Sequence, residues 1–293
     1  MNIEETIKKG SEELKKNKII SHGLDAEMIL SDIMGVEREF LLIKNNIKIS
    51  DNIKKRFKHA INRRVNSEPI AYIIGKKEFW SETFKVSHAT LIPRPETELL
   101  IYKIINFFKN KSINILDIGT GSGCILLSIL KELKFSRGTG IDISKSAIKI
   151  AANNSRIFNL SNRSKFRVFD INKFNLGKYD LIVSNPPYIP SREIKNLSKD
   201  IRYYEPDIAI NGGKDGLDLI KKVIYKSSIL LKNKGLFALE IGNNQYMRVS
   251  QILNSCGFRL IGKEIDYNNN VRCIISTKGW FFKFYYNYFD KSN

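Results

Sequence analysis

Apolar residues recur along the chain with two different periods, and the change of period divides the chain into parts. Over residues 1–66 they return every three or four positions, which predicts helices that each carry one apolar stripe. The stripes are formed by Ala26, Ile29, Leu30, Ile33 and Met34 and by Ile53, Phe57, Ala60, Ile61 and Val65. We interpret them as the core of a small helical bundle, in preference to a surface that holds a cofactor.

Residues 67–92 have a different pattern. Ser67-Glu68-Pro69 ends the helical periodicity, because a proline interrupts the backbone hydrogen bonds of a helix. Large apolar and β-forming residues follow at the spacing of a hairpin: Phe79, Trp80, Thr83, Phe84 and Val86. We therefore predict a hairpin linker over residues 67–92.

From residue 93 to residue 278, short apolar runs alternate with helical patterns. Strands are expected near residues 113, 138, 165, 180, 235, 258 and 271. This alternation predicts an α/β fold with a seven-stranded, mostly parallel sheet and helices on both faces. The remaining segment, 279–293, is a tail rich in aromatic residues. We expect the tail to pack on the protein's own surface, with docking to a partner as the alternative.

Composition narrows the class of protein. The 293-residue chain has a formal net charge of +19, from 49 Lys and Arg against 30 Asp and Glu. We interpret the excess first as a product of a biased genome composition, and the alternative is steering toward an acidic protein or an RNA-rich assembly such as the ribosome. The cysteines and histidines lack the spacing of a metal site or a Ser-His-Asp triad, so no metal is expected. The sequence has no targeting segment, and no apolar run approaches the length of about twenty residues that a membrane span needs. We therefore expect a cytoplasmic protein with no membrane partner.

A glycine-rich loop follows the first strand of the predicted sheet. The apolar run that ends at Asp117 continues into Gly119-Thr120-Gly121-Ser122-Gly123 and then into a helical pattern. Glycines there let the backbone approach a ligand and adopt positive φ angles. A dinucleotide fingerprint fails because position 124 is Cys, and no Gly-Lys-Ser/Thr follows for a phosphate loop. The remaining form is typical of S-adenosylmethionine sites.

The second strand of the predicted sheet ends in Asp142. An acid at this place is suited to bind the hydroxyl groups of a ribose. The alternative is that Asp142 caps the helix that begins near Ser144, and the two roles can coexist.

A third motif, Asn185-Pro186-Pro187-Tyr188, follows an apolar strand over residues 179–184. The amide oxygen of Asn185 and the carbonyl oxygen of Pro186 are able to accept both hydrogens of a planar NH2 group, while Tyr188 offers a flat face. The prolines fix the backbone and so hold these acceptors in one geometry. The alternative is an ordinary turn, since Asn-Pro is common in turns.

Several further segments carry a resemblance that covers residues from about 20 to 278. They include the run from Glu68 to Gly75, Leu91-Ile92-Pro93-Arg94-Pro95-Glu96-Thr97-Glu98, Tyr204-Glu205-Pro206, Gly212-Gly213, Glu240-Ile241-Gly242 and Arg272. Together with the motifs above, they make the chain similar to the release factor glutamine methyltransferases, the HemK/PrmC family. The resemblance implies a class I methyltransferase domain over residues 93–278, preceded by a substrate-binding helical domain over residues 1–66.

The resemblance also implies an activity and a set of site residues. The activity is transfer of a methyl group from S-adenosylmethionine to the side-chain amide of the glutamine in the Gly-Gly-Gln motif of peptide chain release factors. The implied cofactor-binding residues are Asp117, Gly119, Thr120, Gly121, Ser122, Gly123, Asp142, Asp170, Ile171 and Asn185. The implied substrate-binding residues are Asn185, Pro186, Pro187 and Tyr188, of which Asn185, Pro186 and Tyr188 are also catalytic. Arg94, Glu96 and Thr97 resemble a segment that closes the pocket.

Two departures from the family pattern and several alternatives remain. Some relatives have an aromatic residue where Ile171 stands, and the loop at residues 266–270 has Asn where glycine is common, although Asn tolerates left-handed geometry.

The enzyme is expected to be a monomer that acts on protein. Alternative substrates are a glutamine of a ribosomal protein and the exocyclic amine of a flipped adenine in nucleic acid. A non-catalytic RNA- or ribosome-binding protein is the third alternative.

Overall fold

The computed structural model describes residues 1–278, so the aromatic tail over residues 279–293 lies outside the described residues. The chain divides into two structural units. The first comprises Met1–Lys76 and Ser198–Tyr204, and the second comprises Lys77–Leu197 and the chain from Glu205 onward. Each unit has its own hydrophobic core.

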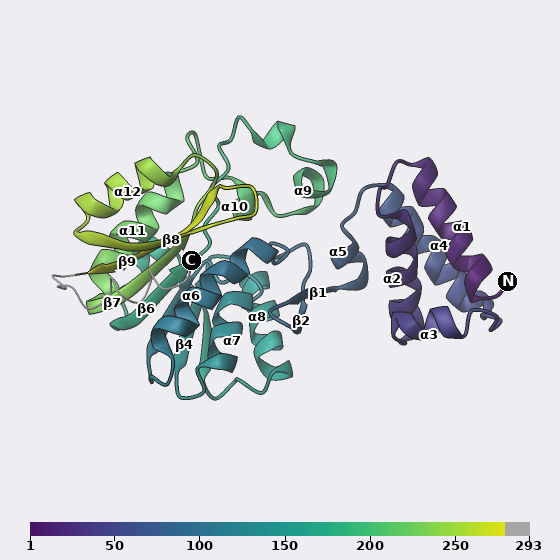
Figure 1. Ribbon diagram of the computed structural model, residues 1–293, viewed down its shortest axis with the longest axis horizontal. Coiled ribbons are helices and arrows are strands. Elements are labelled where there is room, and N and C mark those ends of the chain that lie inside the picture. Colours follow the sequence, from purple (N-terminus) through teal and green to yellow (C-terminus); the bar gives the residue numbers. More distant parts are fainter. Residues whose placement is uncertain (279–293) are drawn as a thin grey trace. The chain divides into compact units, whose positions relative to one another are not determined.

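The first unit is helical (Figure 1). Its helices are α1 (Ile3–Lys16), α2 (His22–Met34), α3 (Arg38–Ile43), α4 (Asp51–Val65), α5 (Ile70–Ile74) and α9 (Lys199–Tyr204). The predicted stripes lie in or against its core, which confirms the expected helical bundle. Helices α1 and α4 pack closely at Gly10, because a Cβ atom there would lie only 2.6 Å from Cζ of Phe57.

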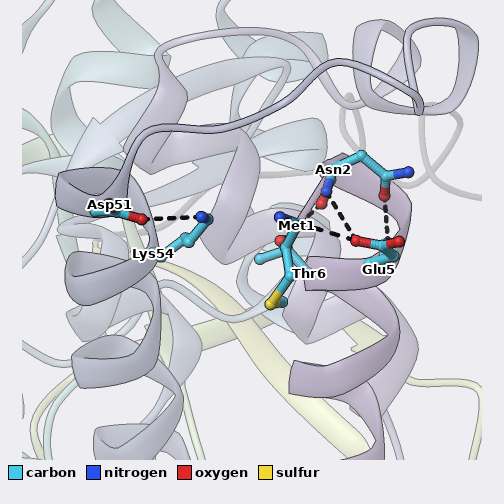
Figure 2. Close-up of polar contacts among 6 residues, drawn as sticks. All are labelled: Met1, Asn2, Glu5, Thr6, Asp51 and Lys54. Carbon is cyan, nitrogen blue, oxygen red and sulfur yellow. Dashed lines mark hydrogen bonds and ion pairs between the residues drawn. The ribbon is translucent and has the colours of Figure 1, made fainter.

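The beginning of α1 is held by local hydrogen bonds (Figure 2). The side-chain oxygen of Asn2 accepts from the backbone N–H of Glu5 at 2.8 Å, and the carboxylate of Glu5 accepts from the N–H of Asn2 at 3.0 Å. This reciprocal capping box satisfies two backbone donors that a helix start would otherwise leave unpaired. Asp51 and Lys54 form an ion pair at 2.9 Å near the start of α4.

Side chains also tie separate segments of the first unit together. Arg64 forms an ion pair with the buried Asp25 at 2.6 Å and donates to the backbone oxygen of Glu68 at 3.1 Å. The hydroxyl of Tyr204 in α9 donates to the backbone oxygen of Asn66 at 2.8 Å. This bond joins α9 to the first unit across more than one hundred residues of sequence.

A two-stranded hairpin lies where the two units meet in the sequence. It consists of β1 (Lys76–Phe79) and β2 (Glu82–Lys85). Phe79 and Phe84 from this hairpin are buried in a core of the second unit, with their rings edge to face at 6.0 Å.

The second unit is built on a seven-stranded sheet. Its strands are β3 (Asn114–Ile118), β4 (Arg137–Asp142), β5 (Ser164–Val168), β6 (Tyr179–Ser184), β7 (Leu231–Glu240), β8 (Phe258–Ile265) and β9 (Val271–Lys278). They lie in the order β5-β4-β3-β6-β7-β9-β8. The pairs from β5 to β7 are parallel, and β9 runs antiparallel to both β7 and β8. All seven strands fall where the sequence predicts them, so the class I methyltransferase architecture is confirmed.

Helices pack on this sheet and bury two separate apolar clusters. They are α6 (Glu98–Phe108), α7 (Cys124–Glu132), α8 (Lys145–Ile157), α11 (Asp218–Leu230) and α12 (Tyr246–Ser255), and a short α10 (Asp207–Ile210) precedes α11. Residues of α6 and α7 enter one cluster, whereas residues of α11 and α12 enter the other. Alternate side chains of β3 supply both clusters, as expected for a strand covered on both faces.

The loop between β8 and β9 forms without the glycine that is common in the family. Asn269 has a left-handed φ of 61°. The carboxylate of Asp266 accepts backbone N–H groups from Asn268 at 2.8 Å and Asn270 at 2.9 Å, and it also pairs with Arg272 at 2.7 Å. The expectation that asparagine preserves this turn is confirmed.

Candidate active site

The strand order reverses at β3, because β4 lies on one side of it and β6 on the other. Ligands of open α/β sheets bind beyond the carboxyl ends of the strands at such a switch point. The two strands are in register there, since Ile118 at the end of β3 pairs with Ser184 at the end of β6. The hydroxyl of Ser184 donates to the backbone oxygen of Ile118 at 2.7 Å. The glycine loop after β3 and the Asn-Pro-Pro-Tyr motif after β6 therefore begin side by side.

A cavity of about 380 Å³ lies at this place in the second unit. Its volume is within the range of sites for small molecules, which extends from about 300 to 1,000 Å³. The predicted site residues that line it are Arg94, Thr97, Gly119, Thr120, Gly121, Ser122, Asp142, Asp170, Ile171, Asn185, Pro186 and Pro187. The remaining predicted site residues, Glu96, Asp117, Gly123 and Tyr188, do not line it.

The glycine loop is bent so that its backbone faces open space. Gly119 and Gly121 have φ angles of 72° and 54°, and a Cβ atom at either position would meet nothing within 4 Å. Gly123, with a φ of 81°, instead lies against α8, where a Cβ atom would be 3.2 Å from that of Ala151. The loop is anchored to β4 because the N–H groups of Gly119 and Thr120 donate to the backbone oxygen of Ile141 at 2.9 and 3.0 Å.

Asp142 joins the glycine loop to the start of α8. One carboxylate oxygen accepts from the N–H of Gly121 at 3.0 Å, and the other accepts from the N–H of Ser144 at 2.9 Å. Burial raises the pKa of Asp142 above its usual range, while these backbone donors oppose the shift. The capping of α8, considered as an alternative role for Asp142, is performed by Ser144, whose hydroxyl accepts from the N–H of Ala147 at 3.2 Å.

Asp117 lies beneath the glycine loop and is fully buried. Its Oδ2 accepts a hydrogen bond of 2.6 Å from the hydroxyl of Thr120. Burial raises the pKa of Asp117 to about 7, with the Thr120 hydrogen bond opposing and the nearby Asp142 carboxylate adding to the rise. Asp117 thus supports the loop from below, and its contact with a cofactor stays a prediction.

Asp170 and Ile171 lie at another part of the cavity wall, after β5. Asp170 caps a short 3₁₀ turn by accepting from the N–H of Asn172 at 2.9 Å. The side chain of Ile171 is buried and lines the cavity beside Phe169. An aliphatic and aromatic wall of this kind is suited to cover the face of a planar ring.

The side chain of Asn185 is connected to buried polar groups outside the predicted motif. Its Nδ2 donates to Oγ1 of Thr97 at 3.4 Å, and the Thr97 hydroxyl donates to Oε2 of Glu240 at 2.7 Å. Glu240 is at the end of β7 and 2% exposed, and burial raises its pKa to about 7. Tyr188 donates its hydroxyl to Oε1 of Glu240 at 3.5 Å.

Tyr188 is held from several sides. Its backbone oxygen accepts from Nε2 of Gln245 at 3.0 Å. Its ring passes so close to Gly242 that a Cβ atom there would be 2.9 Å from the ring. Burial raises the pKa of Tyr188 above its usual range, and the Glu240 carboxylate adds to the rise. Tyr188 therefore connects the motif to β7 through its hydroxyl, and the predicted stacking of its ring on substrate stays a prediction.

The predicted closing segment separates into residues with different places. Arg94 lines the cavity and forms an ion pair of 2.6 Å with Glu205, whose side chain is 1% exposed. This pair fixes the segment before Pro206, which also lines the cavity. Thr97 is buried in the polar chain behind Asn185, whereas Glu96 is exposed at the surface.

Comparison with known proteins agrees with this arrangement. Residues 5–75 match a family described as the PrmC N-terminal domain, and residues 109–267 match a methyltransferase domain. A release factor glutamine methyltransferase of Fusobacterium nucleatum is 38% identical over 273 residues, which cover 92% of this chain and 77% of that protein. The chain belongs to the release factor glutamine methyltransferase family. A second relative of this name, from Buchnera aphidicola subsp. Schizaphis graminum, is 39% identical and covers 95% of this chain and 100% of its own length.

A solved structure agrees with the fold of this release factor glutamine methyltransferase family member. A methyltransferase from Pyrococcus furiosus has a TM-score of 0.51 at 16% identity, with 79% of this chain and 100% of that chain covered. Within residues 1–278 no helix has the length and apolarity to cross a membrane. In the same residues His, Cys, Asp and Glu side chains form no group of three or more that is placed to hold a metal ion.

Reasoning from the sequence missed the place of Glu240 in this family member. The segment Glu240-Ile241-Gly242 contributed to the resemblance, but no role followed from it. The available signal was an acid directly after the apolar run Leu236–Leu239 at the end of a buried strand. An acid in that position is expected to face the same edge of the sheet as Asp117 and Asn185, because the three strands are parallel.

Proposed function

We propose that this enzyme transfers a methyl group from S-adenosylmethionine to the side-chain amide nitrogen of the glutamine in the Gly-Gly-Gln motif of peptide chain release factors. One observation carries the proposal: Asn185 and Pro186 line the same cavity as the glycine loop and Asp142. A pair of amide acceptors thus shares one enclosure with a loop suited to a nucleoside. The names of the relatives support the choice of substrate.

The residues present fit the cofactor. The open space over Gly119 and Gly121 admits a ligand against the backbone, where any side chain would occupy it. The carboxylate oxygens of Asp142 accept from the backbone N–H groups of Gly121 and Ser144, and they retain lone pairs for the hydroxyls of a ribose. Asp170 and Ile171 would border the adenine. When bound, S-adenosylmethionine supplies an electrophilic methyl group on a positively charged sulfur.

Asn185 and Pro186 would hold the substrate amide. The side-chain oxygen of Asn185 and the carbonyl oxygen of Pro186 accept its two N–H groups, and the proline rings keep these acceptors in place. An amide nitrogen is hardly basic, because its lone pair is shared with the carbonyl group, so positioning supplies much of the rate. Such positioning contributes about 7–11 kcal/mol in well-oriented systems. The acceptors also stabilise the positive charge that develops on the nitrogen, and the proton leaves to water.

The first unit is assigned to recognition of the release factor. Support comes from the match of residues 5–75 to the PrmC N-terminal domain family. In this proposal the enzyme acts as a monomer on a protein, and nucleic acid is not its substrate. The net charge of +19 is then used to steer the enzyme toward acidic or ribosome-associated partners.

The test is incubation of the full chain with methyl-labelled S-adenosylmethionine and purified release factors. We expect label on the wild-type release factor and none on a release factor whose Gly-Gly-Gln glutamine is replaced by alanine. Parallel reactions contain ribosomal proteins, total RNA and DNA. Label that persists on the replaced release factor, or that appears only on a ribosomal protein or a nucleic acid, would contradict the proposal.

A further inference from the structure

Behind Asn185 lies a chain of hydrogen bonds that runs in one direction. Asn185 Nδ2 donates to Thr97 Oγ1 at 3.4 Å, and the Thr97 hydroxyl donates to Glu240 Oε2 at 2.7 Å. Thr97 and Glu240 are each 2% exposed, so water does not replace these partners. The three residues come from separate places in the sequence, before α6, after β6 and at the end of β7.

The direction of this chain follows from counting protons. An ionised carboxylate only accepts hydrogen bonds, and a hydroxyl has a single proton to donate. Once Thr97 gives its proton to Glu240, its oxygen is able only to accept from Asn185. A flipped Asn185 would place its oxygen against another acceptor with no proton between them. The amide nitrogen of Asn185 must therefore face Thr97.

We propose that Glu240, acting through Thr97, is a positioning residue that sets the orientation of the Asn185 amide and leaves Oδ1 of Asn185 as the acceptor for the substrate amide. The inference rests on the proposed function, because it explains how one of the two substrate acceptors is kept available. Neither Glu240 nor Thr97 donates to or accepts from substrate in this scheme. Their effect on catalysis passes through Asn185.

Burial is the largest influence on the ionisation of Glu240 and brings its pKa to about 7. Arg272 on β9 favours the carboxylate, and it is itself held by Asp266 at 2.7 Å. Glu96 opposes ionisation, and the hydroxyl of Tyr188 and the thiols of Cys124 and Cys273 also interact with this carboxylate. Hydrogen bonds from the side chains of Thr97 and Asn185 to Glu240 favour its ionised form.

Protonation of Glu240 would remove the direction of the chain. A protonated Glu240 donates to Thr97, and the Thr97 hydroxyl is then free to donate to Oδ1 of Asn185. That turns Oδ1 of Asn185 away from the substrate. The scheme therefore predicts that kcat falls as the pH drops below about 7, with little change in the affinity for S-adenosylmethionine.

The kinetic test compares two substitutions of Thr97. Thr97→Val removes the hydroxyl and keeps the shape, whereas Thr97→Ser keeps the hydroxyl and loses a methyl group. We expect Thr97→Val to lower kcat by about 10- to 100-fold, by analogy with the loss of groups that orient the ligands of a metal ion. Thr97→Ser is expected to retain most of the wild-type kcat. The matched control is Thr83→Val, which makes the same change on the exposed face of β2. Calorimetry with S-adenosylmethionine should give similar Kd values for all four proteins.

A pH series adds Glu240→Gln, which removes the titrating group. We expect wild-type kcat to fall from pH 8 to pH 6 more steeply than that of Glu240→Gln. We also expect the double variant Thr97→Val/Glu240→Gln to be little worse than Thr97→Val alone, because both residues act in one chain. Equal kcat for Thr97→Val and wild type, an equal loss in Thr97→Ser, or fully additive effects would overturn the inference.

A second readout needs no substrate and therefore separates this inference from the proposed function. In protein labelled with ¹⁵N at asparagine, the side-chain NH2 signal of Asn185 is assigned by its loss in Asn185→Ala. Hydrogen exchange of that NH2 group should be slow in wild type and Thr97→Ser and faster in Thr97→Val. Unchanged exchange in Thr97→Val would overturn the inference even if release factors were methylated. A wild-type enzyme that protects the group but leaves release factors unlabelled would refute the proposed function alone.

Discussion

Replacement of Asp142 by alanine tests the cofactor site in the most quantitative way. In the structure this carboxylate accepts from the N–H groups of Gly121 and Ser144, at 3.0 and 2.9 Å, and it borders the cavity. Asp142→Ala removes the acceptors proposed for the ribose and leaves the N–H of Gly121 without its partner. Both effects weaken binding of S-adenosylmethionine, because the loop loses its anchor at the point where the ligand loses its own contact.

The magnitude follows from the number of bonds. A hydrogen bond to a charged group contributes about 1.5–3 kcal/mol, so the loss of one such bond to the ligand together with loosening of the loop amounts to about 3 kcal/mol. Since about 1.4 kcal/mol corresponds to a tenfold change, Kd is expected to rise by about 100-fold.

The assay is titration calorimetry of S-adenosylmethionine into the wild type and the variant, with near-ultraviolet circular dichroism as a check on the fold. Asp51→Ala in the first unit is a suitable control, because Asp51 is an exposed acid in a surface ion pair with Lys54. A Kd for Asp142→Ala within about threefold of wild type, measured on a folded protein, would refute the assignment of Asp142 to the cofactor.

Two further predictions concern the substrate side, and a third concerns the buried Glu240. Asn185→Ala should lower kcat by about 10²–10³ with intact S-adenosylmethionine binding, by analogy with the loss of one preorganised hydrogen-bonding group, and near-normal turnover would refute the role of Asn185. A release factor with Glu in place of the Gly-Gly-Gln glutamine should not be methylated, because a carboxylate has no N–H groups to donate, and a methyl ester detected by mass spectrometry would contradict the mechanism. Burial raises the pKa of Glu240 from about 4.5 to about 7. Between these pH values the folded protein keeps a proton on Glu240 that the unfolded chain has released, so the contribution of Glu240 to the free energy of unfolding falls as the pH rises. Denaturant unfolding at pH 5 and pH 7.5 should show that Glu240→Gln reduces this loss, by up to about 3 kcal/mol, and an identical pH dependence in both proteins would count against it.

The sequence was sufficient to predict the second unit because local and periodic signals agree there. Each apolar run lies between turn residues or helical patterns, and all seven strands form where these runs occur. The sequence also predicts the roles of Gly119, Gly121 and the Asn185-Pro186 pair, because the backbone conformation at these positions depends on the residue type itself. These two motifs lie side by side because β3 and β6 are parallel neighbours in the sheet. The alternation of strands and helices in the sequence favours such a parallel sheet.

The features that sequence reasoning missed depend on contacts over long distances in the chain. Thr97 and Glu240 are 143 positions apart, and nothing in either local segment indicates their hydrogen bond. Tyr204 is likewise 138 positions from Asn66, so the membership of α9 in the first unit was not predictable from local pattern. The burial of Asp117 was likewise not predictable from its local segment, because the packing of the whole sheet places Asp117 beneath the glycine loop.

The most direct test of the account is a crystal structure of the enzyme with S-adenosylhomocysteine and a release factor. The account predicts that the side-chain nitrogen of the Gly-Gly-Gln glutamine lies within hydrogen-bonding distance of Oδ1 of Asn185 and the carbonyl oxygen of Pro186, with the ribose hydroxyls on Asp142. A glutamine bound elsewhere, or an Asn185 amide turned with its nitrogen toward the substrate, would contradict it.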